Sequence, residues 1–229
     1  MVILLVSGGA QAATAPAARG TTPVAPRPKA APPEPPLVIE KAPLVNVRLL
    51  TSLGAIVIEV DAGHAPLTAS NFLRYVDLKR FDDSNFYRAM KVGDSGDLGL
   101  VQGGLRGNPK RVFKPIAHEP TSVTGLSHVS GAVSMARAAP GTAQSDFFII
   151  LGDLKTLDAH EADAAAGIEA DLGYAVFGRV VEGMDVVRAI MEQPVSDTAP
   201  VEAMKGQMLA KPVTLVSARR VPAGAATAA

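Results

Sequence analysis

Between residues 45 and 221 the chain alternates short apolar runs with polar turns. Residues 45–51 alternate apolar and polar side chains, residues 52–54 carry a turn signal with Gly54, and residues 55–60 return as an apolar run. This pattern is typical of a β-hairpin. Further strands are predicted at residues 85–90, 100–102, 131–136, 147–151, 174–181 and 212–221. The region is therefore predicted to be built mainly of strands.

Two stretches have the spacing of helices instead. Residues 66–80 repeat apolar side chains every three or four positions and begin with Pro66, a residue that is favourable in the first helical turn. Residues 183–193 also place their apolar side chains on one helical face. A doubly wound sheet would need a helix after nearly every strand. We therefore predict an all-β-dominated fold, either an antiparallel barrel or a sandwich.

The first 45 residues differ from the rest in composition. Nine of the 18 prolines precede residue 44, whereas all seven Phe and three Tyr lie between Phe72 and Phe177. A stretch without aromatic rings and with many prolines favours an extended, disordered chain over a packed core. We predict a Pro/Ala-rich linker over residues 13–45, a folded domain over residues 46–221 and a disordered tail over residues 222–229.

Residues 1–12 resemble the end of a secretory signal. The apolar run Val2–Val6 is followed by Ala10-Gln11-Ala12, the small-x-small pattern after which signal peptidase cuts. The run is too short to cross a bilayer, which needs about 20 apolar residues. Because basic residues before the run are missing, we expect the signal to be incomplete. We expect export, to the bacterial periplasm, with Ala13 as the first mature residue and no integral membrane span; an Ala-rich disordered terminus on a cytoplasmic protein is the alternative.

The composition excludes several classes of function. The chain of 229 residues has no Cys and carries 22 Lys and Arg against 22 Asp and Glu. It therefore lacks a thiol for a disulfide, a nucleophile or a metal, and its zero net charge argues against nucleic acid as a partner. The sequence also lacks a phosphate loop, a dinucleotide fingerprint and a nucleophile elbow. The histidines show no metal-ligand spacing and are predicted to be surface or loop residues: His64, His118, His128 and His160. We expect neither a metal nor a cofactor.

Several short motifs follow one another in a fixed order along the predicted domain. They are Phe-Tyr-Arg at 86–88, Val-Gln-Gly-Gly at 101–104, Gly-Ala-Val-Ser-Met-Ala-Arg at 131–137, Ser-Asp-Phe-Phe-Ile at 145–149, and the run from Tyr174 to Val187. Together they resemble the cyclophilin family of peptidyl-prolyl cis-trans isomerases. The resemblance implies a closed eight-stranded antiparallel β-barrel capped by two α-helices. It also implies that the chain accelerates X–Pro isomerisation during protein folding, acting on unfolded or partly folded polypeptides, and we expect a monomer.

The reaction suits a chain without a nucleophile or cofactor. Rotation about an X–Pro bond breaks amide resonance against a barrier of roughly 18–20 kcal/mol, but no covalent bond is made or broken. The enzyme needs a pocket for the pyrrolidine ring and a fixed donor that stabilises the twisted amide more than the planar one.

The resemblance assigns these roles to particular residues. Arg88 is implied to be the catalytic donor to the prolyl nitrogen, and Gln102 to bind the substrate backbone or to hold Arg88. Phe148 is implied to form the floor of the proline pocket. The other implied binding residues are Leu157 and Leu100 as pocket walls, Tyr174 beside them, and the edge segment Ala136, Arg137 and Ala138, which pairs with the substrate backbone.

Three departures from the family pattern bear on activity. The run from Arg88 to Gln102 is longer than usual and rich in glycine. Asp146 stands where a Gln commonly supports the catalytic Arg, so it is predicted to form an ion pair that either positions Arg88 or partly neutralises it. Thr156 replaces a Trp, and residues 159–172 lengthen the next loop. These departures leave open an alternative function, a catalytically weak proline-peptide binding or holdase module with the same fold.

Overall fold

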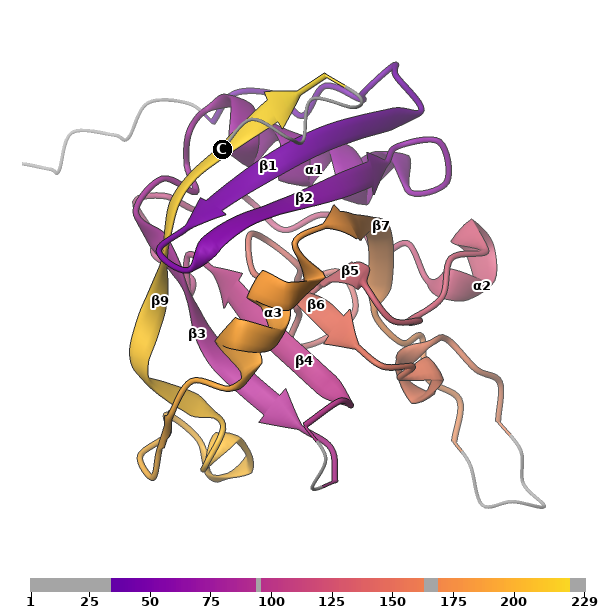
Figure 1. Ribbon diagram of the computed structural model, residues 1–229. Helices are drawn as coiled ribbons and strands as arrows, with labels where there is room; N and C mark the ends of the chain where they lie inside the picture. The colour runs from indigo at the N-terminus through magenta and orange to yellow at the C-terminus, as the bar shows by residue number, and fades with distance from the viewer. Residues whose placement is uncertain (1–33, 94–95, 163–168, 223–229) are drawn as a thin grey trace, which may run out of the picture. The chain divides into compact units, whose positions relative to one another are not determined.

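Eight antiparallel strands form a closed ring in the computed structural model, which describes residues 34–93, 96–162 and 169–222. The ring strands are β1 (Leu44–Thr51), β2 (Gly54–Asp61), β3 (Ser84–Lys91), β4 (Gly99–Gly104), β5 (Ala132–Met135), β6 (Phe147–Leu151), β7 (Ala175–Glu182) and β9 (Met208–Val221), and a ninth strand, β8 (Val195–Ser196), lies outside the ring. The ring runs in the order β1-β2-β7-β5-β6-β4-β3-β9, and β9 pairs back with β1 (Figure 1). The short β8 pairs with β9. The predicted eight-stranded barrel is confirmed.

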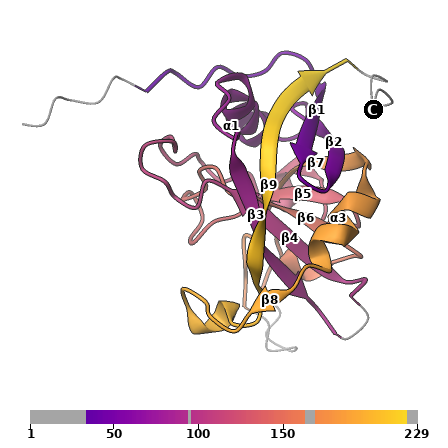
Figure 2. The same ribbon diagram turned by 60° about the vertical axis from the view of Figure 1, so that its left-hand side comes forward.

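Two helices pack against this barrel. They are α1 (Pro66–Asp77), which contacts β2, β7 and β9, and α3 (Met184–Met191), which contacts β2, β3, β4 and β6. The two helices lie apart, with strands of the barrel between them (Figure 2). A four-residue helix α2 (Thr121–Thr124) and the 3₁₀ turns η1 (Lys155–Leu157) and η2 (Glu202–Met204) lie in the connecting segments. Among the described residues, no helix has the length and apolar character needed to cross a bilayer.

The first helix, α1, ends at Asp77, which is earlier than the predicted end at Arg80. Lys79 adopts a left-handed conformation with φ of 53°, and the N–H of Arg80 donates to the carbonyl of Tyr75 at 2.8 Å. This backbone turn is the Schellman-type end that satisfies the last carbonyl groups of a helix. The helix therefore ends at Asp77 although its apolar spacing continues.

Aromatic side chains fill the interior of the barrel. Phe72 of α1 is 1 % exposed, and its ring centroid lies 5.2 Å from that of Phe81, 5.5 Å from that of Phe147 and 5.0 Å from that of Phe177. Because Phe147 and Phe177 belong to β6 and β7, this ring joins the helix to two strands of the barrel. The cluster is the packing centre of the domain.

A second apolar cluster lies on the other face of the same strands. Successive side chains of a strand point to opposite faces, so Phe147 and Ile149 join the barrel core, whereas Phe148 and Ile150 join the second cluster. The loop residue Leu154 is also buried in it. The barrel wall thus carries a second apolar layer on its outside, and loop side chains pack against this layer.

Residues 35–43, which fall inside the predicted linker, belong to the same compact unit as the barrel. The carbonyl of Pro35 accepts a hydrogen bond from Nη1 of Arg74 (3.0 Å), and the N–H of Glu40 donates to Oγ of Ser70 (2.8 Å). This stretch therefore contacts α1 and does not stand away from the domain. The predicted signal over residues 1–12, the rest of the linker up to residue 33 and the tail from residue 223 lie outside the described residues.

Candidate active site

One row of paired residues across four strands positions the centre of the site. Arg88 of β3 is paired with Gln102 of β4, Gln102 with Phe148 of β6, and Phe148 with Ser134 of β5. Directly opposed residues on neighbouring strands share a face of the sheet. The barrel therefore brings the predicted catalytic Arg88 beside the predicted pocket floor, Phe148.

Two glutamine side chains hold the guanidinium of Arg88. Its Nη1 donates to Oε1 of Gln102 at 2.9 Å. This is the contact that Gln102 would make in one of its two predicted roles, that of holding Arg88. Nε and Nη2 of Arg88 both donate to Oε1 of Gln207, at 2.9 and 2.6 Å, and Nη2 also lies 3.5 Å from the sulfur of Met90. Burial lowers the pKa of the Arg88 guanidinium, but an arginine stays protonated at neutral pH. The site thus presents a fixed cation.

Gln207 is a site residue that the sequence did not indicate. It lies between η2 and β9, and its own Nε2 donates to the carbonyl of Ala203 at 3.1 Å. Its backbone carbonyl accepts a hydrogen bond from the N–H of Ala89 at 2.8 Å. These contacts fix Oε1 of Gln207 toward Arg88. No sequence motif surrounds Gln207, and the pairing of β3 with β9 brings the two residues together.

Asp146 does not form the predicted ion pair with Arg88. Among the described residues, Oδ1 of its carboxylate accepts a hydrogen bond from the N–H of Arg106 at 2.9 Å and another from the hydroxyl of Ser145 at 3.4 Å. Burial raises the pKa of the Asp146 carboxyl above its ordinary value, and hydrogen bonds from the loop backbone offset only part of this rise. The prediction of an ion pair was wrong because the loop after β4 wraps around the carboxylate. Gly104 permits this at a φ of 136°, and a Cβ there would lie 2.2 Å from Oδ1 of Asp146.

Two other side chains, Tyr87 and Gln102, lie between Asp146 and Arg88. The hydroxyl oxygen of Tyr87 accepts a hydrogen bond from Nε2 of Gln102 at 2.8 Å, and the Asp146 carboxylate is near enough to that hydroxyl to raise its pKa. The hydrogen bond to Tyr87 turns Oε1 of Gln102 toward Arg88. Tyr87 reaches this position because it is left unpaired in a β-bulge between Phe86 and Arg88, and bulges re-aim side chains next to functional sites. The carboxylate raises the pKa of Tyr87 further above its ordinary value, after burial as the main cause.

The predicted residues of the proline pocket lie together in the second apolar cluster. Phe148 and Leu100 are buried there, and Leu157, Tyr174 and Ala136 pack against them while half-exposed. The ring of Tyr174 meets that of Phe148 edge-on, with centroids 5.4 Å apart and planes at 85°. All five predicted apolar contacts therefore meet beside the row that carries Arg88.

A polar pocket of about 360 Å³ adjoins Gln102. Arg137 and Asp146 contribute its charged groups. The guanidinium of Arg137 lies 4.8 Å from the centroid of the Tyr174 ring, and its Nε donates to the carbonyl of Gly173 at 3.0 Å. Arg137 therefore supports the pocket wall at Tyr174 as well as lining the polar pocket.

The predicted edge segment 136–138 follows directly after β5. The N–H of Ala136 donates to the carbonyl of Asp146 at 2.8 Å, and the N–H of Ala138 donates to Oγ1 of Thr142 at 3.2 Å. Within the described part of the chain, the backbone N–H of Arg137 has no acceptor of this kind. Of the three residues, Arg137 is therefore the one whose backbone N–H is open to a strand-like substrate.

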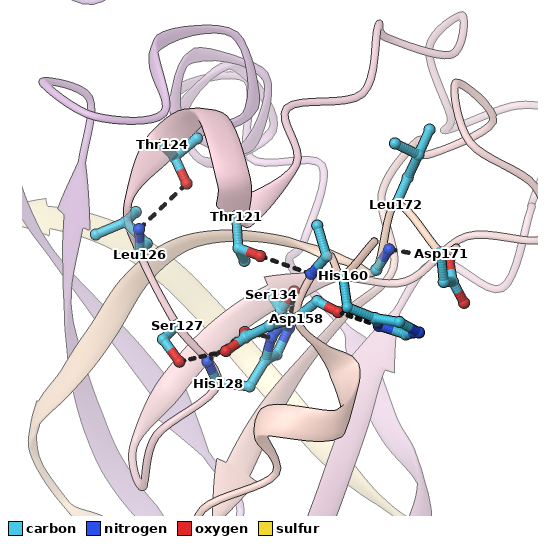
Figure 3. A network of polar contacts seen from close by, with 12 residues as sticks. Thr121, Thr124, Leu126, Ser127, His128, Ser134, Asp158, His160, Asp171 and Leu172 are labelled. Carbon is cyan, nitrogen blue, oxygen red and sulfur yellow. Dashed lines mark hydrogen bonds and ion pairs between the residues drawn. The ribbon is translucent and has the colours of Figure 1, made fainter. Parts of the chain in front are cut away.

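One of the four histidines, all of which were predicted to be surface or loop residues, is a buried loop residue. This residue, His128, is fully buried and surrounded by polar partners (Figure 3). Over the described ranges, no three His, Asp or Glu side chains are grouped as a metal site requires.

Comparisons with known proteins agree with this geometry. The family model for cyclophilin type peptidyl-prolyl cis-trans isomerase matches residues 46–217. A peptidyl-prolyl cis-trans isomerase of Acinetobacter baylyi is 36% identical over 165 residues, which cover 70% of this chain and 80% of the relative. The peptidyl-prolyl cis-trans isomerase A of Dickeya dadantii is 31% identical, covering 76% and 83%. A Cryptosporidium parvum cyclophilin, crystallised in the presence of the dipeptide Ala-Pro, has the same fold, with a TM-score of 0.58, 19% identity and coverage of 77% and 99%.

Proposed function

The chain belongs to the cyclophilin-type peptidyl-prolyl cis-trans isomerase family and isomerises X–Pro bonds, and from this premise we propose that Arg88 and the apolar cluster at Phe148 form its active site. The observation that carries the proposal is the row of paired residues that sets a fixed cation beside an apolar cluster. Those are the two parts that isomerisation requires.

Arg88 acts as the donor that stabilises the twisted amide. When the X–Pro bond twists, the lone pair of the prolyl nitrogen is no longer delocalised and becomes a hydrogen-bond acceptor. The contacts to Gln102, Gln207 and Met90 engage at most four of the five guanidinium N–H groups, which leaves one N–H of Nη1 for the substrate among the described contacts. Because the glutamines hold the guanidinium before substrate binds, little reorganisation is needed in the transition state.

The apolar cluster receives the prolyl ring. We place the ring on Phe148, between Leu100, Leu157 and Tyr174, and the substrate backbone along Arg137. The Cryptosporidium parvum neighbour was crystallised with Ala-Pro, a ligand of the class that this pocket would take. Since the Asp146 carboxylate bonds to the N–H of Arg106 and the hydroxyl of Ser145 instead of to Arg88, it leaves the charge of Arg88 intact. Asp146 therefore gives no reason to prefer the alternative function, a catalytically weak binding module.

A protease-coupled assay on a tetrapeptide with an Ala-Pro bond tests the function. Without catalysis the bond isomerises in tens to hundreds of seconds. The folded wild-type chain should shorten this time in proportion to its concentration. A rate equal to the uncatalysed background would contradict the proposal, and the dependence on Arg88 is treated in the Discussion.

Gln207→Ala should lower kcat about tenfold with little change in KM. The substitution removes the acceptor of two charged N–H donors of Arg88, and hydrogen bonds to charged groups are the strong ones. The guanidinium then keeps its contact to Gln102 but loses its fixed orientation. Gln193→Ala is the matched control, because the Gln193 side chain bonds to the carbonyl of Ala189 on α3. Equal kcat values for Gln207→Ala and wild type would refute this role.

We further propose that the protein works after export, in the bacterial periplasm, as a monomer that assists the folding of other polypeptides. The support is the apolar run before Ala10-Gln11-Ala12 and the Pro/Ala-rich stretch that follows it. The monomer is proposed because one chain supplies the complete site. N-terminal sequencing of the secreted form should give Ala13 as the first residue. An uncut chain that remains in the cytoplasm would contradict export.

A further inference from the structure

A fully buried histidine lies behind the proline pocket. His128 precedes β5 and is 0 % exposed. Its Nδ1 lies 2.6 Å from Oδ1 of Asp158, and its Nε2 lies 3.0 Å from Oγ of Ser134 (Figure 3). The backbone N–H of His128 also donates to Oδ1 of Asp158 at 2.9 Å, while the hydroxyl of Ser127 donates to Oδ2. Both ring nitrogens and both carboxylate oxygens are therefore engaged.

These contacts fix the tautomer of His128. Although burial alone would raise the pKa of Asp158, the hydrogen bonds from Ser127 and His128 bring it below its ordinary value, so the carboxylate is ionised and only accepts. Nδ1 of His128 must then carry a proton. Burial lowers the pKa of the His128 ring, which leaves the ring neutral at pH 7, so Nε2 accepts a hydrogen bond from the hydroxyl of Ser134.

Asp158, His128 and Ser134 contact one another in the order of a hydrolytic Asp–His–Ser triad, but a substrate cannot reach the serine as it does in such a triad. In such a triad the serine oxygen is reached by a substrate carbonyl, with donors for an oxyanion beside it. Ser134 is 0 % exposed, and so is His128. The network is therefore closed to a substrate, and its effect must pass through the residues packed on it.

Those residues belong to the pocket. The ring of His128 lies nearly parallel to that of Phe148, with centroids 6.0 Å apart and planes at 13°, and meets the ring of Tyr174 edge-on at 6.5 Å. Asp158 directly follows Leu157, whose carbonyl accepts a hydrogen bond from the N–H of Tyr174 at 3.0 Å. The network thus adjoins the floor and two walls of the proposed pocket.

We propose that His128 is a positioning residue of the proline pocket, which Asp158 and Ser134 hold in place so that Phe148 and Tyr174 keep the spacing a prolyl ring needs. This inference rests on the proposed function of the pocket. When the pocket rings of Phe148 and Tyr174 are fixed before the substrate binds, less free energy is needed to order them on binding. Because the pyrrolidine ring contacts the pocket in both the planar and the twisted state, the effect falls on KM and not on kcat.

His128→Phe tests this, since it keeps an aromatic ring and deletes both ring hydrogen bonds. We expect KM for the Ala-Pro tetrapeptide to rise about three- to tenfold, with kcat within about twofold of wild type. His64→Phe is the matched control, because it breaks an exposed His–Asp pair with Asp61 at 2.8 Å. A folded His128→Phe variant with the wild-type KM, or with a lower kcat alone, would overturn the proposal.

Two milder variants decide the question if His128→Phe does not fold. Ser134→Ala removes the partner of Nε2, and Asp158→Asn weakens the partner of Nδ1. Both should raise KM and shift the NMR signals of the ring protons of Phe148 and Tyr174. Wild-type KM and unshifted ring signals in both variants would overturn the proposal.

The same experiments separate this inference from the proposed function. An inactive wild type, or a kcat that does not depend on Arg88, refutes the assignment of the active site. An active wild type whose kcat depends on Arg88 but whose KM is insensitive to His128 refutes the positioning role alone.

Discussion

Arg88→Ala is expected to lower kcat/KM for an Ala-Pro tetrapeptide about 100- to 1,000-fold, nearly all of it in kcat. Loss of one preorganised donor to a developing charge typically has an effect of this size. The apolar contacts of the prolyl ring with Phe148 and its neighbours remain, so KM should change little. Progress curves of the protease-coupled assay at several substrate concentrations separate the two constants.

Two further variants control this measurement. Arg179→Ala makes the same change at an exposed arginine that pairs with Glu59 at 2.8 Å, and it should leave kcat/KM unchanged. Arg88→Lys keeps the charge but lacks the planar fork that bonds both glutamines, so its kcat should lie between those of Arg88→Ala and wild type. A folded Arg88→Ala protein with wild-type kcat/KM would show that the twisted amide is stabilised elsewhere.

The largest effect on stability is expected at Phe72. Phe72→Ala removes the ring that contacts Phe81, Phe147 and Phe177, and should lower the free energy of unfolding by about 3–5 kcal/mol, because a cavity remains where the ring was. For a domain of this size that corresponds to a fall in Tm of roughly 10 °C. Urea unfolding followed by circular dichroism measures the change.

The control for Phe72 is an apolar residue that remains exposed. Leu78, at the end of α1, is 46 % exposed, and Leu78→Ala should change the free energy of unfolding by less than about 0.5 kcal/mol. If Phe72→Ala lowered the free energy of unfolding by no more than this control does, the aromatic cluster would not be the packing centre of the barrel.

The sequence was sufficient for the parts of the fold and site that depend on strand pairing. Alternation of apolar and polar residues predicted the barrel strands, and the motif order placed Arg88, Gln102 and Phe148, which pairing then sets side by side. Leu100, Phe148 and Tyr174 followed in the same way, because each lies in or next to a recognisable motif. Their roles in catalysis stay predictions until the variants above are measured.

The missed features depend on contacts that leave no local pattern. Gln207 approaches Arg88 from a loop 119 positions away in the chain, so nothing near either residue indicates the pair. His128 stands in a polar stretch typical of a surface loop, and its burial depends on Asp158, 30 positions later. Asp146 lines the polar pocket beside Gln102, but the turn of its carboxylate away from Arg88 depends on a close approach by Gly104, which the sequence does not show.

The pairing of β1 with β9 also determines when the domain can fold. Asn46 is paired with Val221, so the contact that closes the barrel joins the first and last strands of the domain. Such a non-local contact makes folding slow relative to chains whose contacts are local. During synthesis β1 emerges long before its second partner exists, so the barrel cannot close until the last strand has left the ribosome. An isomerase of this topology therefore closes its own barrel only after β9 has been synthesised.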